Sequence, residues 1–346
     1  MPVPTHTPAH LVANMRLSES GGGDRPPTSM RELASGVDAL YLSARGVVSP
    51  ALLAHLEDRR SWAQEVKRAA PCEIGPLTFG IAPHGWGKYR FCLDHANTRI
   101  GITTSRRLPT IPVQPRAQYL HAVGPAAVVD AVHELLAPDF GELTFSVARV
   151  DLFADWQGFA LTAADAGRFV CRADARRTYE HAGTLTGFDF GSRSTHTFTA
   201  RIYDKTAETA GKGADWWTQV WGGRYVPGQP VIRVEFEVGR QALREFGLDT
   251  PAQVLAAAGD LWAYASGQWL TFRSPTADRT RSRWPLAPGG GPCRRPPWSI
   301  APSASNGGGT STTPRRCAAC CPASPATSPP MPPSSAPTTS TTPSLP

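Results

Sequence analysis

Three segments in the middle of the sequence alternate charged and apolar residues with a period of two. They are 149–155, 201–205 and 232–238. Successive side chains of a β-strand point to opposite faces of a sheet, so each segment is predicted to be a strand with one charged face. Such strands fit an antiparallel sheet that is covered by helices on its apolar face. This pattern limits the fold more than any other feature of the chain.

The segments around this centre indicate the same fold class. Strands are predicted at 37–43, 145–155, 185–191, 196–205 and 230–239, with a hairpin formed by 89–93 and 98–102. Helices are predicted at 49–65, 125–136, 162–173 and 250–264 from apolar spacing and helix-start residues. Strands joined by short turns, with a few helices between them, indicate an α+β fold with a largely antiparallel central sheet and flanking helices.

Both ends of the chain depart from this pattern. Residues 1–31 are rich in Pro, Gly, Ser and Thr and are predicted to be a disordered arm before a domain at 36–286. Residues 287–346 hold 15 of the 34 prolines and no acidic residue, so we predict a disordered low-complexity tail. The tail reads like GC-rich DNA translated out of frame. We hypothesise a frameshift near 286–290 that truncates and inactivates the domain; a genuine disordered basic arm is the alternative.

Charge and cysteines narrow the function classes only a little. Of the net charge of +7, the four arginines of the tail supply +4. The net charge of the rest of the chain is therefore only weak evidence of nucleic-acid binding. The pair Cys317 and Cys320 lacks the second pair of ligands that a zinc site requires. No apolar run resembles a signal peptide or reaches the ~20 residues that span a bilayer. We therefore expect a cytoplasmic protein with no membrane partner.

The charged faces of the three central strands carry the candidate chemistry. Counted with the period of two of a strand, these faces hold Arg149, Asp151 and Asp155 on the first strand; Arg201, Tyr203 and Lys205 on the second; and Arg233, Glu235 and Glu237 on the third. If the strands are neighbours, the four carboxylates repel one another, and a hard cation such as Mg²⁺ or Mn²⁺ would relieve that repulsion. The alternative is a solvated sheet face on which opposite charges pair across strands.

A tyrosine between cations adds a nucleophile. Nearby positive charge favours the phenolate, so Arg201 and Lys205 are expected to lower the pKa of Tyr203 and to activate it for covalent catalysis. With a metal and arginines to hold an anion, this set predicts a metal-dependent tyrosine nuclease. Alternatively, Tyr203 is a sheet residue whose hydroxyl binds Glu235, and Glu237 only pairs with Arg240 or Arg233. The tryptophans Trp216, Trp217 and Trp221 fit either a core or a base-stacking surface.

The segments 187–194 (GFDFGSRS) and 200–205 (ARIYDK) resemble the signature of the replication initiation factor family, the rolling-circle initiators of certain plasmids, phage-like elements and conjugative transposons. The flanking segments 149–155 and 232–237 match in type and order, as does the tryptophan-bearing insert. The resemblance covers roughly 36–284, with its specific motifs within 149–240. The histidine–hydrophobe–histidine metal motif of better-known rolling-circle nickases is absent, and His181 and His196 are assigned no role.

The resemblance implies a site-specific DNA nickase with an α+β catalytic domain. Tyr203 would attack the origin phosphodiester, stay attached to the 5′ phosphate and free a 3′ hydroxyl for a polymerase. The implied metal ligands are Asp151 and Glu235, supported by Asp155 and Glu237; Lys205 and Arg201 would stabilise the phosphate or the phenolate. The implied DNA contacts are Ser192, Arg193, Arg149 and Arg233. A homodimer and a host helicase are the further partners.

Two other functions stay open. One is a non-catalytic DNA-binding or regulatory remnant that keeps the fold but does not cut. The other is an unrelated α+β binding protein, for which we expect neither metal dependence nor salt-sensitive DNA affinity.

Overall fold

The computed structural model of the 346-residue chain describes residues 30–195 and 197–288. The predicted arm apart from its last two residues, the tail beyond residue 288 and the cysteines at 317 and 320 lie outside the described residues. The frameshift hypothesis therefore stays a prediction.

The described segments form strands, helices and short 3-10 turns in an alternating order. The strands are β1 (Arg31–Arg45), β2 (Ala70–Ile74), β3 (Leu77–Ile81), β4 (Phe91–Asp94), β5 (Thr98–Ile102), β6 (Ile111–Pro115), β7 (Thr144–Gln157), β8 (Phe169–Cys171), β9 (Arg176–His181), β10 (Thr184–Phe190), β11 (Phe198–Asp204), β12 (Val231–Gly239) and β13 (Leu270–Phe272). The helices are α1 (Pro50–Glu65), α2 (Ala117–Val123), α3 (Pro125–Phe140), α4 (Lys205–Lys212), α5 (Trp217–Trp221), α6 (Arg240–Glu245), α7 (Pro251–Ala256) and α8 (Ala258–Tyr264).

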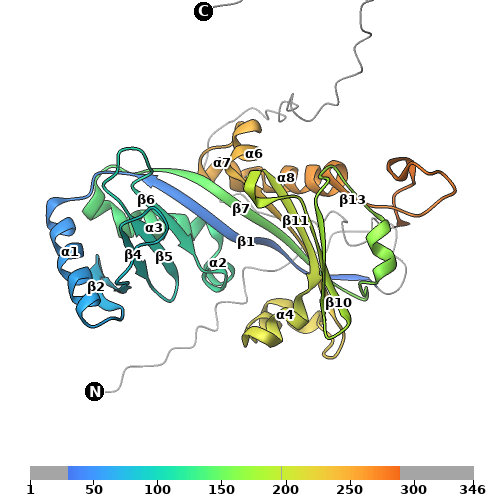
Figure 1. Cartoon of the computed structure of the whole chain (residues 1–346), viewed down its shortest axis with the longest axis horizontal. Coiled ribbons are helices and arrows are strands. Elements are labelled where there is room, and N and C mark those ends of the chain that lie inside the picture. Colours follow the sequence, from blue (N-terminus) through green and yellow to red (C-terminus); the bar gives the residue numbers. More distant parts are fainter. Residues whose placement is uncertain (1–29, 196, 289–346) are drawn as a thin grey trace, which may run out of the picture.

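A single large sheet organises the described part of the chain. Its 11 strands run in the order β2-β3-β4-β5-β6-β1-β7-β12-β11-β10-β9, while β8 and β13 form a separate two-stranded sheet. Every pair of neighbouring strands is antiparallel. The long strands β1 and β7 pass from one part of the molecule to the other and join them (Figure 1). The predicted α+β class with a largely antiparallel sheet and flanking helices is confirmed.

Helices lie on both faces of the sheet where β7, β12 and β11 run side by side. On the core face, α6 and α7 contact β7, and Trp262 of α8 packs edge-on against Phe236 at 5.0 Å between ring centroids. On the opposite face, α2 and α5 contact β1, α4 contacts β12, and Trp217 packs against Phe153. The strand β12 is buried along its whole length because both of its faces are covered. This second face holds the charged residues predicted from the sequence.

Four details differ from the sequence predictions. The predicted helix at 162–173 is a 3-10 turn, Ala163–Gly167, followed by β8, although the capping box of Thr162 and Asp165 is formed. The turn ends early because Phe169 leaves it to pack against rings of β10 and β13, a tertiary contact that outweighs helix propensity. The predicted helix at 250–264 is divided into α7 and α8.

The other two differences are at strand ends. Lys205 begins α4 instead of ending a strand, since the side chain of Asp204 accepts a hydrogen bond from the Ala207 amide and caps the helix. The strand β1 begins at Arg31, within the predicted arm and before the predicted domain boundary at residue 36.

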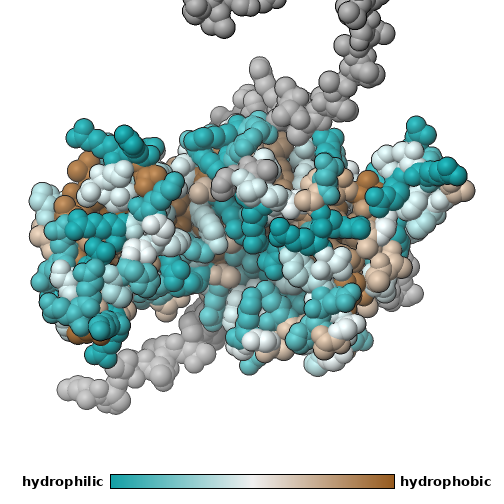
Figure 2. Space-filling view, viewed as in Figure 1, coloured by the Kyte–Doolittle hydropathy of each residue, from teal (hydrophilic) through white to brown (hydrophobic). Residues whose placement is uncertain are grey.

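Hydrophilic residues cover the middle of the face that Figure 2 shows, between the two parts of the molecule. Among the described residues, no single helix has the length and apolar character needed to cross a membrane; α2 and α3 together reach that length but are bent by 108°.

Candidate functional site

The register of four neighbouring strands places the predicted residues in rows on one sheet face. One row contains Asp155, Arg233, Tyr203 and Gly187, taken from β7, β12, β11 and β10. The next row contains Phe153, Glu235, Arg201 and Asp189, and a third pairs Asp151 with Glu237. No bulge interrupts the pairing of β12 with β7 or β11, so the period of two holds and the charged residues share a face as predicted.

A polar groove of about 360 Å³ opens over these rows. Its walls include six of the predicted residues, namely Arg149, Asp151, Arg201, Tyr203, Lys205 and Glu235. They also include Asp38 and Glu208, which sequence reasoning did not assign to the site, and Trp217, which it considered for either a core or a base-stacking surface. The site is therefore a groove in which cations, carboxylates and an aromatic ring alternate.

Tyr203 lies on the floor of the groove with only 9% of its surface exposed. Its hydroxyl donates a hydrogen bond of 3.0 Å to Oε2 of Glu235. The guanidinium of Arg201 lies over the tyrosine ring at 4.6 Å, and Lys205 Nζ lies at 5.7 Å from the ring centroid. The cations thus contact the face of the ring, and neither is hydrogen-bonded to the phenolic oxygen.

The pKa of Tyr203 consequently differs from the sequence prediction. Burial raises it well above the usual range, the negative charge of Glu235 raises it further, and Arg233 opposes both. The expected lowering by Arg201 and Lys205 is wrong for this state of the protein. The hydroxyl bonded to Glu235 is instead the arrangement that was considered as the alternative.

Arg233 and Asp155 form an ion pair beneath the groove. Arg233 is 0% exposed and donates to both carboxylate oxygens of Asp155, at 2.7 and 2.8 Å, and to Oδ1 of Asp38 at 2.8 Å. Asp155 also accepts from the indole of Trp221 at 2.8 Å. The guanidinium of Arg233, predicted to contact DNA, is enclosed between the rings of Phe153 and Trp217 in this structure. Both carboxylate oxygens of Asp155 thus accept hydrogen bonds from these side chains.

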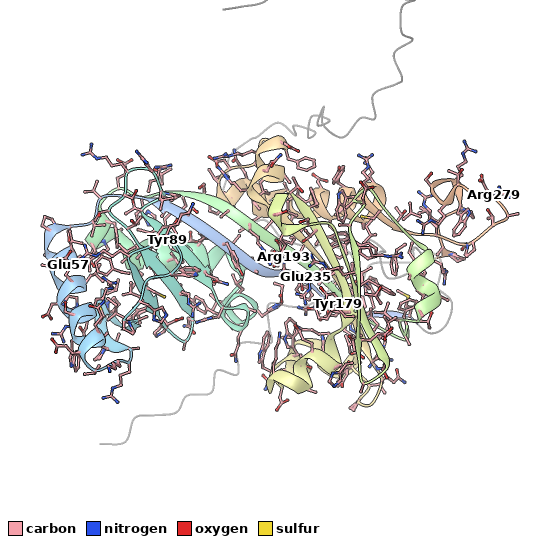
Figure 3. All side chains as sticks on the ribbon, viewed as in Figure 1. Glu57, Tyr89, Tyr179, Arg193, Glu235 and Arg279 are labelled. Carbon is pink, nitrogen blue, oxygen red and sulfur yellow. The ribbon has the colours of Figure 1, made fainter. Side chains whose placement is uncertain are left out.

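A second ionic cluster lies at the other end of the charged face. Nε of Arg149 donates to Asp151 at 2.7 Å, and its Nη2 lies 2.9 Å from Oε2 of Glu237. The side chain of Arg193 is 58% exposed and donates to the same oxygen of Glu237 at 2.9 Å. Figure 3 shows Arg193 and Glu235 close together in projection over this face. Ser192, also predicted to contact DNA, shares a hydrogen bond of 2.8 Å with the hydroxyl of Ser194.

Two carboxyl groups at the groove have raised pKa values because they are buried near other negative charges. Burial and the charges of Glu235 and Glu237 raise the pKa of Asp151 to about 7, although Arg149 opposes them. Burial and the charge of Asp38 raise the pKa of Glu235. A divalent cation would favour the ionised form of both groups, so their chemistry fits a metal held by Asp151 and Glu235. Within 30–195 and 197–288, however, no three His, Cys, Asp or Glu residues are grouped so as to hold a metal ion.

Sequence reasoning missed Asp38 because a β-bulge decides where it points. The pairing of β1 with β7 shifts between Val37 and Ala39, and Asp38 is the extra residue. Its carboxylate contacts Arg233 and lies 3.4 Å from Nε2 of His121 on α2. Burial raises the pKa of Asp38, but the charge of Arg233 and the contact with His121 more than offset that effect and hold it well below its usual range.

Glu208 was missed although a signal was present. It accepts from Lys205 at 2.6 Å and from Lys212 at 2.8 Å, contacts with helical spacings of three and four residues. Reading 205–212 as a helix would have revealed the pairing. Burial lowers the pKa of Lys205, and the charge of Arg233 lowers it further. Nζ of Lys205 also lies over the ring of Trp217 at 4.7 Å.

The chain resembles known proteins in structure and not in sequence. No protein-family model and no curated protein sequence matches the chain. A solved structure of a rolling circle replication initiator protein from Geobacillus stearothermophilus is similar at 17% sequence identity and a TM-score of 0.45. The match covers 73% of this chain and 92% of that one. A likeness of this degree assigns no role to any residue here. That protein does belong to the class that the sequence motifs resemble, the rolling-circle replication initiators.

Proposed function

We propose that this chain is the replication initiator of a mobile element and that it nicks DNA, with Tyr203 as the nucleophile. The observation that supports this best is the pairing of Tyr203 with Glu235 at 3.0 Å on the floor of a polar groove. A nucleophile within hydrogen-bond reach of its base, with cations beside it, is the minimum equipment for attack on a phosphodiester.

In the proposed reaction, Glu235 takes the proton of Tyr203, and the raised pKa of the carboxyl makes it a stronger base. The phenolic oxygen forms a bond to phosphorus while the bond from phosphorus to the 3′ oxygen breaks. The 3′ oxygen takes a proton from water and leaves as a hydroxyl that a polymerase can extend, and the hydroxide ion left from that water takes the proton back from Glu235. The strand stays attached to Tyr203 through its 5′ phosphate. Arg201 lies 3.5 Å from Oε1 of Glu235 and would neutralise the charge that the phosphate brings.

Mg²⁺ or Mn²⁺ would be held by Asp151 and Glu235. When bound, such a cation polarises a phosphoryl oxygen. In the present arrangement Asp155 and Glu237 would act through their arginine partners, because their carboxylates accept hydrogen bonds from Arg233 and Arg193.

The proposed substrate is single-stranded or supercoiled DNA. Arg201, Lys205 and Lys212 give the groove a cationic wall, and the exposed Arg193 stands at its end. Trp217, only 3% exposed, packs between Arg233 and Lys205 and serves the core more than a base-stacking surface. A homodimer and a host helicase and polymerase are the further partners in this proposal.

The test is a nicking assay on overlapping single-stranded oligonucleotides and supercoiled DNA from the element that encodes the chain. We expect a covalent protein–DNA adduct that requires Mn²⁺ or Mg²⁺, disappears in EDTA and is lost in Tyr203→Phe. Tyr89→Phe is the matched control, since Tyr89 lies in the other part of the molecule (Figure 3). An adduct that persists in Tyr203→Phe and is mapped to a residue outside the groove would refute the proposal.

The burial of Tyr203 favours a second candidate. A tyrosine that is 9% exposed, with a raised pKa and a satisfied hydroxyl, also suits a non-catalytic DNA-binding remnant. Salt-sensitive binding of the same DNA without any adduct would support that function.

A further inference from the structure

A second tyrosine lies in the same row of the sheet as Tyr203. The residue opposite Tyr203 on β10 is Gly187, and the residue opposite Gly187 on β9 is Tyr179. Directly paired residues of antiparallel strands point to the same face, so both tyrosines belong to the groove face. Neighbouring strands are ~4.8 Å apart, which places the two Cα atoms about 10 Å from each other.

The residue between the tyrosines has no side chain. A Cβ atom on Gly187 would lie 2.8 Å from Cβ of Tyr203 and 2.8 Å from the carbonyl oxygen of Ile202. No side chain therefore stands between the two tyrosines in this row. Figure 3 shows Tyr179 beside Glu235 in projection, over the same set of strands.

Tyr179 has the contacts of a nucleophile and is more accessible than Tyr203. It is 43% exposed, and its hydroxyl donates to Oδ2 of Asp189 at 2.8 Å. Oδ1 of the same carboxylate lies 3.8 Å from Nε of Arg201, whose Nη1 lies 3.5 Å from Glu235. Each tyrosine is thus hydrogen-bonded to its own carboxylate, and Arg201 stands between the two carboxylates.

The edge of the sheet leaves room for DNA at this place. The strand β9 is the last of the sheet, and all six of its residues are exposed. Arg177 lies next to Asp189 in the second row, and its side chain makes no hydrogen bond or ion pair with the described residues. A guanidinium in that position can bind a phosphate of an extended strand.

We propose that Tyr179 is a second nucleophile, which cleaves a second phosphodiester while Tyr203 still holds the first 5′ phosphate. This inference rests on the proposed function, because a nickase whose only nucleophile is occupied cannot cut again. Two tyrosines with separate proton acceptors let one chain cut, hold and rejoin strands.

The bonds balance without any further reagent. The phenolic oxygen of Tyr179 forms a bond to phosphorus, its proton passes to Asp189, and the bond to the 3′ oxygen breaks. That oxygen takes a proton from water, and the hydroxide ion left behind takes the proton from Asp189. The new 3′ hydroxyl then attacks the phosphate on Tyr203 and gives its proton to Glu235. The bond between phosphorus and Tyr203 breaks, and Glu235 returns the proton to the phenolate.

The experiment counts adducts per protein molecule. The full chain is loaded with one oligonucleotide that carries the cleaved sequence and is then challenged with a second oligonucleotide of different mass. Intact-mass spectrometry separates singly from doubly modified protein. Trypsin separates the two sites, since Tyr203 falls in peptide 202–205 and Tyr179 in peptide 178–193.

We expect doubly modified molecules in the unaltered chain, with the second oligonucleotide on peptide 178–193. Tyr179→Phe should give none, whereas the control Tyr89→Phe should give as many as the unaltered chain. Asp189→Asn keeps the nucleophile but removes its proton acceptor, so the second adduct should form at least about 10²-fold more slowly. The Tyr179→Phe change removes only an exposed hydroxyl, and circular dichroism checks that the variant is folded.

Three results would overturn the proposal: an unaltered chain that is only ever singly modified on peptide 202–205, a second adduct on any other peptide, or doubly modified Tyr179→Phe. These differ from a failure of the proposed function, in which no adduct forms on any tyrosine.

Discussion

Replacing Arg233 with methionine should destabilise the protein more than any other single change at the site. The guanidinium is fully buried and makes two hydrogen bonds to Asp155 and one to Asp38. Methionine keeps much of the packing between Phe153 and Trp217 but leaves the buried carboxylate of Asp155 and the partly buried carboxylate of Asp38 without their cation. Removing one partner of a buried ion pair costs about 3–5 kcal/mol, and the second stranded carboxylate places Arg233→Met at the upper end of that range.

The loss of stability in Arg233→Met should depend on pH, and the pKa of Asp38 determines the direction of that dependence. Arg233 holds that pKa below its usual value in the folded protein, so the pair stabilises the fold above the ordinary Asp pKa of about 4 and is lost as the pH falls further. In Arg233→Met the same partly buried carboxyl should have a raised pKa and take up a proton on acidification. The difference in the free energy of unfolding between the two proteins should therefore shrink from neutral pH toward pH 4.

The assay is urea unfolding followed by tryptophan fluorescence at neutral and acidic pH, with linear extrapolation to water. Lys212→Met is the control, because it removes a cation from the same groove but one that is exposed and paired only with Glu208. That change should cost less than about 1 kcal/mol. If Arg233→Met costs no more than Lys212→Met, or if its cost is the same at both pH values, the reasoning fails.

Three further changes test the rest of the site. Glu235→Gln removes the proton acceptor of Tyr203 and should slow adduct formation by about 10²–10⁴-fold, as measured by single-turnover kinetics. The DNA affinity, measured by fluorescence anisotropy, should be nearly unchanged. An unaltered rate of adduct formation would contradict the proposed base. Gly187→Ala places a Cβ 2.8 Å from Tyr203 and should lower the free energy of unfolding by about 1–3 kcal/mol, as measured in urea. Because the pKa of Asp151 is about 7, Mn²⁺ must displace a proton from this carboxyl below that pH. The affinity of the protein for Mn²⁺, measured by titration calorimetry, should therefore rise about tenfold per pH unit up to neutrality and then level off. Asp151→Asn should abolish this pH dependence.

The sequence predicts the site well where the backbone is regular. From Ile232 to Val238 the strand has no bulge against either neighbour, so a count of two places Arg233, Glu235 and Glu237 on one face without any knowledge of the fold. The count fails where the chain leaves that geometry. The bulge at Asp38 inserts one residue, and the cap at Asp204 turns the chain into a helix before Lys205.

Burial is the property that sequence could not supply. The alternation of charged and apolar residues predicts that Arg233 and Arg201 share a face of the sheet. Only the packing of α5 over that face decides that Arg233 is enclosed while Arg201 lines the groove. The same packing reverses the expected pKa of Tyr203. Cations near a phenol lower its pKa in the open, whereas here desolvation and the carboxylate of Glu235 have the larger effect.

The raised pKa of Tyr203 distinguishes the proposed role of this tyrosine from that of Tyr179. At rest, the hydroxyl of Tyr203 is tied to Glu235, and both groups hold their protons more tightly than they would in water. A cation entering the groove would favour the carboxylate form of Glu235, which can then receive the proton of Tyr203; cation binding and activation then become a single event. Tyr179 is held by Asp189 at the exposed sheet edge and needs no such event. The buried tyrosine is thus suited to a first cut that depends on correct binding, and the exposed one to a second cut on a strand already held.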